Sequence, residues 1–470
     1  VGSNKTVSVG TLALGNGSNG GLAANYTLTG GTHQLTVNQR PLNATLARQY
    51  DGTTAAAGST VSSFDALQGG ETLTMTGSGT AASANVANGI AMSSNGNLAL
   101  ANGTGAASNY SLNSTVINIA KRVLNSSGSK TYDANTNALA GAITLSNLVS
   151  GEALNHSGTA TISSANAGSY TISNLSGISI ADGSGGAASN YTLTGGTHNF
   201  TVNRRVVGVS GTRLYDATTN AVASDLSTHA NLVGSQTLTL SGTGTIASKD
   251  VGSNKTVSVG TLALGNGSNG GLAGNYTLSG GTHQLTVNQR PLNATLARQY
   301  DGTTAAAGST LSSFDALQGG ETLTMTGSGT AASANVANGI TMSSNGNLAL
   351  ADGTGAASNY SLNSTVINIT KRVLNSSGSK VYDANTNALA GAITLSNLVS
   401  GEALNHSGTA TISSANAGSY TITNLAGITI ADGSGGAASN YTLTGGTHNF
   451  TVNRRVVGVS GTRLYDATTN

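Results

Sequence analysis

One short pattern carries the side chains with the strongest chemical character in this chain. It reads as a basic residue, one spacer, Tyr-Asp, a small residue, any residue and Thr, and it occurs six times. Successive Tyr-Asp pairs lie 82, 83, 85, 82 and 83 residues apart, so the chain is a tandem array, and its period has to be known before a fold is assigned. This pattern, the signature, comprises Tyr50, Asp51 and Thr54; Tyr132, Asp133 and Thr136; Tyr215, Asp216 and Thr219; Tyr300 and Asp301; Tyr382 and Asp383; and Tyr465 and Asp466.

The aspartates of the signature could serve either of two roles. Carboxylates are the hard oxygen ligands that Ca²⁺ prefers, so Asp51, Asp133 and Asp216 are candidate calcium ligands. Asp182, the first residue of the loop Asp182-Gly183-Ser184-Gly185, is a fourth candidate. The equivalent loops of other repeats carry Asn16 and Asn102 at this position. A tight site needs several acids, and the chain has only 17 Asp and Glu residues. The sequence therefore favours a structural turn without a cofactor and keeps Ca²⁺ as the alternative.

The turn can be specified further from the residue that follows each Asp. This residue is Gly52 in one kind of repeat but Ala134 and Ala217 in the others, and Ala tolerates positive φ poorly. We therefore predict a type I turn or an Asx-turn without a left-handed residue, closed by the Thr three residues after the Asp. The Tyr is expected to pack at the end of the core and to bond a backbone group. The basic residue is expected to form an exposed pair with the Asp, or to join the arginines near each repeat boundary in a basic collar for acidic polysaccharide.

Other catalytic chemistry is not indicated. The chain has no Cys, hence no thiol nucleophile and no disulfide framework. None of the seven His residues lies in an i, i+4 metal-binding pattern, and Ser is too abundant for a Ser/His/Asp coincidence to carry information. The chain is therefore predicted not to be an enzyme, with no catalytic residue.

Composition excludes further classes of function. Only 8% of the residues are charged and the formal net charge is +2, which argues against a nucleic-acid partner and against disorder. No apolar run is long enough to span a bilayer, and no signal peptide is present. With 66 Gly and 4% aromatic residues, each repeat must have a thin core, so support from neighbouring repeats is expected.

The repeats can be delimited by aligning the signature and its surroundings. Residues 1–220 match residues 251–470 with ten substitutions, so three successive repeats form a larger duplicated block. Each boundary follows an Arg and contains no Gly/Ser linker, which predicts a semi-rigid connection. Both ends are expected to cut through repeats. The expected divisions are a partial repeat at 1–40, whole repeats at 41–122, 123–205, 206–290, 291–372 and 373–455, and a partial repeat at 456–470.

Within a repeat, apolar residues alternate with polar ones. Leu35 and Val37 alternate with Thr36 and Asn38, and comparable short runs are bounded by clusters of Gly, Asn and Ser. We therefore predict an all-β chain, built as a tandem array of small antiparallel β-sandwich domains of Ig-like or related type that form an extended rod. A β-solenoid is the alternative, but a solenoid should show a shorter period than the one found here.

Further segments accompany the signature: Leu232-Val233-Gly234, Leu238–Gly244, Lys249-Asp250-Val251-Gly252 and Asn275-Tyr276-Thr277-Leu278. Together with the signature they make the chain resemble the YDG/MBG repeat domains of large bacterial surface proteins, which are frequent in filamentous-haemagglutinin-like exoproteins exported by two-partner secretion. The resemblance covers the whole chain and supplies no catalytic residues. It implies an extracellular location on the surface or in the matrix of a Gram-negative bacterium.

Three functions agree with this description. The first is a non-enzymatic stalk or filament body of a giant adhesin or biofilm-matrix protein, in which each repeat contacts its neighbours in the same chain. The second is a multivalent array that binds host or matrix polysaccharide. The third is a fibre in which chains associate laterally through strand edges. The scarce aromatic residues occupy core-like positions, which favours the stalk.

Overall fold

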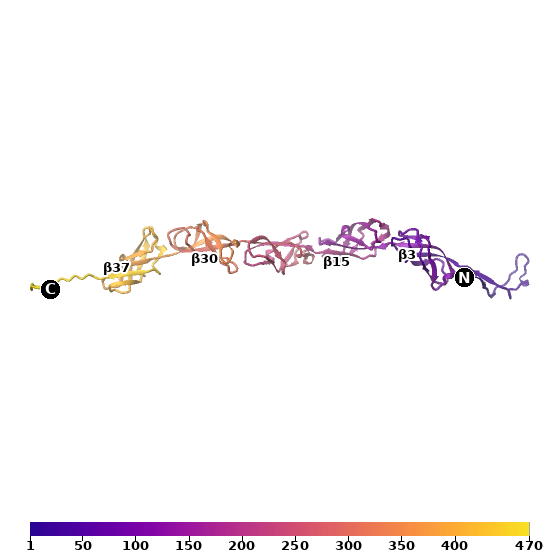
Figure 1. Ribbon diagram of the computed structural model, residues 1–470, viewed down its shortest axis with the longest axis horizontal. Helices are drawn as coiled ribbons and strands as arrows, with labels where there is room; N and C mark the ends of the chain where they lie inside the picture. Colours follow the sequence, from indigo (N-terminus) through magenta and orange to yellow (C-terminus); the bar gives the residue numbers. More distant parts are fainter. Residues whose placement is uncertain (470) are drawn as a thin grey trace. The chain divides into compact units, whose positions relative to one another are not determined.

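The computed structural model describes residues 1–469, and Asn470 at the end of the last partial repeat lies outside the described residues. Strands occupy half of the chain, and residues 1–469 contain short 3-10 turns but no α-helix (Figure 1). The prediction of an all-β tandem array is confirmed. The 3-10 turns are Ala23–Asn25, Ala107–Asn109, Ala140–Ala142, Ala188–Asn190, Ala223–Asp225, Ala273–Asn275, Ala357–Asn359, Ala390–Ala392 and Ala438–Asn440.

The first two whole repeats show the two main strand patterns. The repeat at 41–122 contains β3 (Arg40–Gln49), β4 (Thr60–Phe64), β5 (Leu73–Thr76), β6 (Thr80–Ala81), β7 (Ala87–Ser94), β8 (Ala99–Asn102) and β9 (Tyr110–Ala120). The repeat at 123–205 contains β10 (Arg122–Val123), β11 (Asn125–Thr131), β12 (Asn137–Leu139), β13 (Ile143–Ser146), β14 (Leu154–Ile162), β15 (Gly168–Asn174), β16 (Ile178–Asp182), β17 (Tyr191–Thr192) and β18 (His198–Asn203).

The remaining repeats follow the same plan. The repeat at 206–290 contains β19 (Arg205–Val206), β20 (Gly208–Leu214), β21 (Asn220–Val222), β22 (Thr228–Ala230), β23 (Leu238–Ser241), β24 (Thr243–Ile246), β25 (Gly252–Ser258), β26 (Ala263–Asn266), β27 (Tyr276–Thr277) and β28 (His283–Asn288). The repeat at 291–372 contains β29 (Arg290–Gln299), β30 (Thr310–Phe314), β31 (Leu323–Thr326), β32 (Thr330–Ala331), β33 (Ala337–Ser344), β34 (Ala349–Asp352) and β35 (Tyr360–Thr370). The repeat at 373–455 contains β36 (Arg372–Val373), β37 (Asn375–Val381), β38 (Asn387–Leu389), β39 (Ile393–Ser396), β40 (Leu404–Ile412), β41 (Gly418–Asn424), β42 (Ile428–Asp432), β43 (Tyr441–Thr442) and β44 (His448–Asn453).

The last strand of the first whole repeat shows why these residues form strands. Along β9 the side chains of Thr115, Ile117 and Ile119 are buried, and the residues between them are more exposed. Successive side chains of a strand point to opposite faces, so this alternation places one apolar face on the core. β-branched residues such as Val116 and Thr115 also favour the extended backbone.

The sheet of the 41–122 repeat has the strand order β4-β3-β9-β7-β6, and β5 pairs with β8 separately. Its first and last strands, β3 and β9, run parallel, with Arg40 opposite Tyr110 and Gln49 opposite Ala120. The expectation of purely antiparallel sheets is therefore wrong for this pair, and the sheets are mixed. The physical reason is chain direction: parallel first and last strands begin at one end of the repeat and finish at the other. The next repeat can then follow directly, and the rest of the repeat forms the long crossover that a parallel pair requires.

The later repeats keep the same parallel pairing of an early and a late strand. β11 pairs with β18, β20 with β28, β29 with β35 and β37 with β44, all in parallel. Every sheet assigned within residues 1–469 uses strands of one repeat only. A continuous solenoid would stack its sheets across repeat boundaries, so this arrangement favours a domain array over the β-solenoid alternative. An Ig-like arrangement stays a prediction.

The two partial repeats differ from the whole ones. In the first, β1 (Gly2–Thr6) pairs with β2 (Gln34–Val37), and Leu35 and Val37 are exposed. Residues 456–469 form no strand, whereas the identical residues 206–219 contribute β19 and β20 to their repeat. These segments therefore need the remainder of a repeat before their apolar side chains can be buried.

The chain forms two compact units, and the division runs through the 206–290 repeat rather than between repeats. The first unit comprises residues 1–207, 231–238 and 264–280, and the second comprises residues 208–230, 239–263 and 281–470. The 206–290 repeat therefore contributes residues to both units.

Part of the hydrophobic core lies across the repeat boundaries, whereas the cluster around Phe450 and Val452 lies within the 373–455 repeat. In one cluster, Leu46, Tyr50 and Ile117 of the 41–122 repeat pack with Leu124 and Tyr191 of the next repeat. The duplicated cluster unites the equivalent residues of the 291–372 and 373–455 repeats. Each repeat thus has a leading half, which packs on the repeat before it, and a trailing half, which packs on the repeat after it. We call the contact between a trailing half and the next leading half a joint. The predicted repeat boundaries stay predictions, but the expectation that each repeat needs its neighbours agrees with this packing.

Candidate functional site

The signature lies near the start of each repeat in sequence, and in the first four copies its turn lies at the joint with the following repeat. In the first whole repeat, the Asp51 carboxylate accepts the backbone N–H of Thr53 at 2.9 Å, which is the predicted Asx-turn. The residue that closes the turn is two positions after the Asp, not three as predicted, and its hydroxyl also donates to Asp51. Thr54 takes part through its backbone, because its carbonyl accepts the N–H of Ala81 at 2.7 Å. Thr136 and Thr219 accept from Ile162 and Ile246 in the same way.

The residue that follows each Asp has a left-handed backbone. Its φ is 79° at Gly52, 64° at Ala134 and 63° at Ala217. The prediction that this position avoids positive φ is therefore wrong. A non-glycine residue in this region costs about 1–2 kcal/mol, and the hydrogen bonds to the Asp carboxylate offset that cost.

Replacing Ala134 by Gly should therefore stabilise the 123–205 repeat. We expect a gain of about 0.5–1 kcal/mol, because relief of the left-handed strain exceeds the entropy that Gly adds to the unfolded chain. Hydrogen exchange of a peptide spanning residues 130–137 would measure the gain, and its Thr131 distinguishes it from the second copy, which has Val381. The second copy is an internal control and should not change, and Gly52→Ala should have the opposite effect. Faster exchange in Ala134→Gly would contradict this account.

The basic residue of the signature is buried, contrary to the expectation of an exposed pair. The Arg48 side chain is only 6% exposed, and its Nη1 lies 2.7 Å from Asp51 Oδ2. Its guanidinium also donates to the carbonyls of Thr53 and Ala55. The arginine thus ties together both sides of the turn and is not available for a surface collar.

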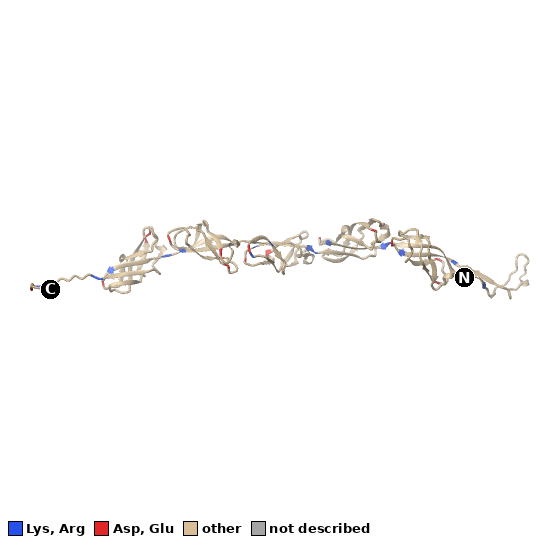
Figure 2. Ribbon diagram, viewed as in Figure 1, with Lys and Arg blue, Asp and Glu red and all other residues tan. Residues whose placement is uncertain are grey.

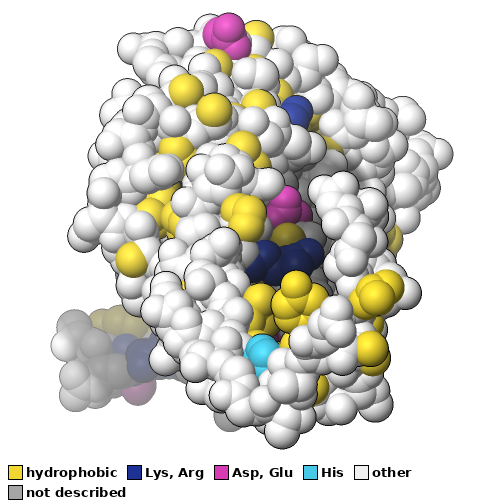
Figure 3. Space-filling model, turned by 90° about the vertical axis from the view of Figure 1, so that its right-hand side faces the viewer, with side chains coloured by type: hydrophobic (Ala, Val, Ile, Leu, Met, Phe, Trp, Pro, Cys, Tyr) yellow, Lys and Arg dark blue, Asp and Glu magenta, His cyan; other side chains and the backbone are white. Residues whose placement is uncertain are grey.

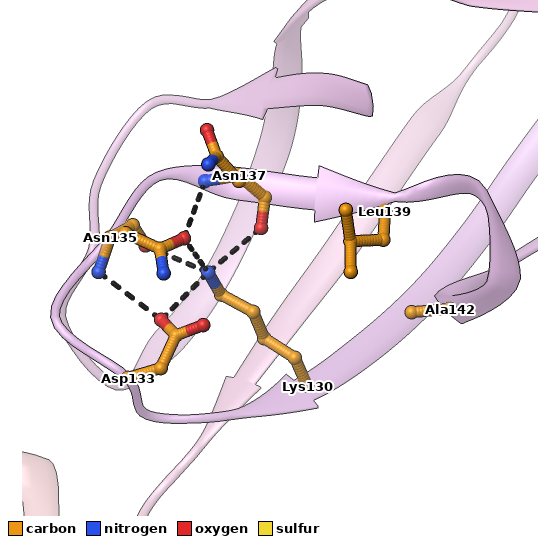
Figure 4. Close-up of a pocket in the computed structure, with 6 residues that line it drawn as sticks. All are labelled: Lys130, Asp133, Asn135, Asn137, Leu139 and Ala142. Atoms are coloured by element: carbon orange, nitrogen blue, oxygen red, sulfur yellow. Dashed lines mark hydrogen bonds and ion pairs between the residues drawn. The ribbon is translucent and has the colours of Figure 1, made fainter. Parts of the chain in front are cut away.

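In the 123–205 repeat, Lys and Asn replace Arg and Thr in this role. Lys130 Nζ lies 2.9 Å from Asp133 Oδ1, and it donates to Asn135 Oδ1 at 2.9 Å and to the carbonyl of Asn137 at 2.8 Å (Figure 4). The side chains of Leu139 and Ala142 line the adjoining pocket. Because hydrogen bonds from a charged donor are stronger than those between neutral groups, this cluster stabilises the turn.

The calcium candidates do not assemble into a group of acids. Asp51, Asp133 and Asp216 each pair with the basic residue of their own signature. Asp182 Oδ1 accepts the N–H of Ala188 at 2.7 Å. Within residues 1–469, no three His, Cys, Asp or Glu residues lie close enough to hold a metal ion. Calcium binding stays a prediction without a preformed set of ligands.

The tyrosine of the signature has a role that the sequence did not indicate. Tyr50 is 5% exposed, and its hydroxyl donates to Glu152 Oε1 at 2.6 Å in the next repeat, not to a backbone group as predicted. Tyr191 of that next repeat donates to Glu152 Oε2 at 2.7 Å. The two rings meet edge to face, with centroids 5.4 Å apart and an interplanar angle of 80°. We call these two tyrosines and the residue between them the clasp. Burial, with the bond to Glu152, raises the pKa of Tyr50 to about 12, so the phenol stays protonated and able to donate.

The clasp recurs at the other three joints, each of which lies inside one compact unit. Tyr215 and Tyr360 bind the two oxygens of Glu321 at 2.6 and 2.8 Å. At the second joint the central residue is Gln236, which donates to Tyr132 at 2.9 Å and accepts from Tyr276 at 2.6 Å. The fourth clasp consists of Tyr300, Glu402 and Tyr441.

A buried asparagine beside each clasp forms further bonds across the joint. Asn190 is 1% exposed, its Oδ1 accepts the N–H of Val86 at 2.9 Å, and its Nδ2 donates to Asn85 Oδ1 at 3.0 Å. Asn275, Asn359 and Asn440 make the equivalent bonds. Because an unpaired buried N–H costs about 1–3 kcal/mol, these bonds fix the register of the two repeats.

The arginines at the repeat boundaries donate hydrogen bonds to backbone carbonyls at the joint. Arg122 donates to the carbonyl of Asn147 at 2.6 Å and to the carbonyl of Tyr50 at 3.4 Å. Arg205 and Arg372 make the corresponding bonds, and Arg290 Nε donates to the carbonyl of Tyr215 at 2.7 Å. Together with the buried Arg48, Arg213 and Arg298, these arginines belong to the structural framework rather than to a basic collar.

In two copies of the signature, the tyrosine is not covered by the leading half of a following repeat. Tyr382 is 37% exposed and Tyr465 is 94% exposed, whereas Tyr300 in the same motif is 4% exposed. The turn therefore forms from local sequence, but burial of its tyrosine requires the leading half of another repeat.

The residues completing the clasp were missed because no local pattern marks them as a site. Glu152, Gln236 and Asn190 each lie about 100 residues from their partner in the preceding repeat. The available signal was the recurrence of Glu or Gln and of Asn-Tyr at one fixed place in every repeat.

The fold and the joints define a class of protein: an all-β tandem-repeat protein whose repeats are clasped to each other. The chain matches the YDG domain at residues 32–117, 120–198, 201–286, 282–367 and 369–448. It therefore belongs to the YDG domain family, with five copies of the domain in tandem. No curated protein matches the chain significantly. Residues 1–469 contain no helix that is long and apolar enough to cross a membrane.

Proposed function

We propose that this chain is a non-enzymatic structural region, the stalk or filament body, of a large bacterial surface adhesin or matrix protein. The observation that carries the proposal is the joint. Four times, a buried pair of tyrosines, a central Glu or Gln and a buried Asn connect one repeat to the next. A connection with a shared core and fixed hydrogen bonds resists bending and pulling, whereas a flexible linker does neither.

The surface supports a mechanical role. Charged residues are sparse along the chain, and the polar residues are chiefly Ser, Thr and Asn (Figure 2). Most of the face in Figure 3 is backbone and uncharged polar side chains, with hydrophobic side chains scattered among them and a few charged side chains near its middle. A surface of this kind offers little to a charged partner, and nucleic acid in particular is not expected.

A polysaccharide-binding array is less well supported by the tyrosines. Sugar binding typically uses exposed aromatic rings, but the clasp tyrosines such as Tyr191 and Tyr215 are fully buried. The strongly exposed rings of Tyr26 and Tyr465 belong to the partial repeats. Lateral association through strand edges is an alternative that the experiment below distinguishes.

We place the chain outside the cell, on the surface or in the matrix of a Gram-negative bacterium, with two-partner secretion as its proposed export route. The support is the resemblance described above and the absence of Cys, because a chain that crosses a membrane unfolded is not obstructed by premature disulfides. Protease treatment of intact cells of the producing bacterium should remove the repeats without lysis.

Negative-stain electron microscopy of the 470-residue chain tests the mechanical proposal. We expect stiff particles in which successive repeats keep a constant angle. Loosely linked beads with variable angles would overturn the stalk, and lateral bundles with a fixed repeat would favour the self-assembling fibre.

A further inference from the structure

One joint contains a charged residue that the others lack. At the joint between the 206–290 and 291–372 repeats, Lys249 Nζ lies 2.5 Å from Glu321 Oε1 and 5.8 Å from the centroid of the Tyr215 ring. The Lys249 side chain is 41% exposed and the Glu321 side chain is only 7% exposed. The lysine thus reaches from the surface of one repeat to a buried carboxylate of the next.

Glu321 accepts three hydrogen bonds from two repeats. Tyr215 and Lys249 of the preceding repeat bind its Oε1, and Tyr360 of its own repeat binds Oε2. Burial alone would raise the pKa of Glu321, but the bonds from Lys249 and the two tyrosines outweigh burial and hold it below its ordinary value. The carboxylate therefore remains charged, and the lysine is its paired cation.

The other joints have no cation at this place. Ala84, Ala165 and Ala334 occupy the position of Lys249 in the preceding repeats of the other joints. Where Ala165 stands, the central residue of the next clasp is the neutral Gln236, which still satisfies both tyrosines. Where Ala84 and Ala334 stand, the central residue is Glu152 or Glu402 and is bound by its two tyrosines without a lysine. Lys249 is thus found only where the next repeat carries a carboxylate, although a carboxylate does not require it.

We propose that the trailing half of the 206–290 repeat selects a following repeat that carries a carboxylate at the centre of the clasp, so that this joint restricts which repeat can follow. The proposal rests on the structural function proposed above. The partner is chemically defined: a repeat with Glu at this position, as in Glu71, Glu152, Glu321 and Glu402. A second copy of the 206–290 repeat would instead place a neutral Gln against Lys249. That contact would lose the ion pair while the lysine still has to fit beside the Tyr215 ring.

Hydrogen exchange of the full 470-residue chain can test this selection. A peptide from Ser248 to Val257 reports on the joint through the backbone N–H of Val251, which donates to Asn359 Oδ1, and Ser248 and Asp250 distinguish it from the matching residues 1–7. We expect Glu321→Gln to speed exchange there roughly tenfold, as loss of a charge-assisted bond predicts, and to have a smaller effect when Lys249→Ala is also present. Raising the salt concentration should weaken this joint in the unsubstituted chain but not in the double variant.

Glu402→Gln is the matched control, because its joint has Ala334 at the position of Lys249. A peptide from Ser333 to Thr341 reports on that joint through Val336, and Thr341 distinguishes it from the copy with Ala91. We expect a smaller effect than that of Glu321→Gln. Equal effects of the two substitutions, with no dependence on Lys249, would overturn the proposal.

A repeat exchange keeps the test informative if Glu321→Gln disturbs folding. Replacing residues 291–372 by a second copy of 206–290 should loosen the joint that follows Lys249, whereas replacing them by a copy of 123–205 should not. Identical joint protection in both chimaeras would overturn the proposed selection. That result would not contradict the proposed function as a stalk. Flexibly linked beads in electron microscopy of the unsubstituted chain would contradict that function.

Discussion

Replacing Tyr300 by Ala should open the joint between the 291–372 and 373–455 repeats. Tyr300 is 4% exposed, packs edge to face on Tyr441 at 5.4 Å and donates to Glu402 at 2.6 Å. Truncating a buried aromatic side chain typically costs about 3–5 kcal/mol, and we expect the free energy of joint opening to fall by that amount. Tyr300→Phe should cost less, about 1–2 kcal/mol, because the ring packing is retained and only the hydrogen bond is lost.

The chain provides two controls for this experiment. Tyr382 occupies the equivalent position in the next copy of the signature but is 37% exposed. Tyr382→Ala should therefore change the free energy of unfolding by less than about 1 kcal/mol. Exchange of the Ser333 to Thr341 peptide measures the opened joint, and the Ser83 to Ala91 peptide of the unaltered first joint should keep its protection in the same molecule. An equal loss in Tyr300→Ala and Tyr382→Ala would show that the tyrosine acts on its own repeat and not on the joint.

A two-repeat fragment should be far more stable than either of its repeats alone. Residues 41–205 contain one complete joint, in which Tyr50, Leu124 and Tyr191 are buried. Burying a large apolar side chain contributes about 1.5–3 kcal/mol, so the joint should add on the order of 5 kcal/mol. A single repeat at 123–205 lacks the contacts of both of its joints, and we expect it to be marginally folded or unfolded.

Circular dichroism during heating would compare the fragments. We expect the two-repeat fragment to melt at least about 15 °C higher than residues 123–205. Tyr50→Ala in the two-repeat fragment should remove most of the difference, because it removes one side of the joint. Equal melting temperatures would mean that the core of each repeat is sufficient for stable folding, and that the clasps do not add to the stability of the chain.

Part of the site could be predicted from local sequence. The Asx-turn followed from Asp51 and the polar residues after it, because a short carboxylate side chain can bond the backbone two residues ahead. The left-handed position did not follow, because the argument from Ala134 considered only the steric cost of positive φ. The structure shows the buried Lys130 and its oxygen acceptors that hold the turn in place.

The sequence by itself determined that this protein is an all-β tandem array, because hydrophobic alternation and a fixed period are properties of neighbouring residues in the chain. It also located the signature at the start of every repeat. Only the tertiary structure decided what the signature is for. The parallel pairing of β3 and β9 carries the chain from one end of a repeat to the other. The Tyr50 hydroxyl then meets Glu152, a residue 102 positions away whose proximity no local pattern reveals. Because Tyr50 is buried against Leu124 and Tyr191 of the next repeat, the role of the signature is seen in the joint and not in the repeat that contains it.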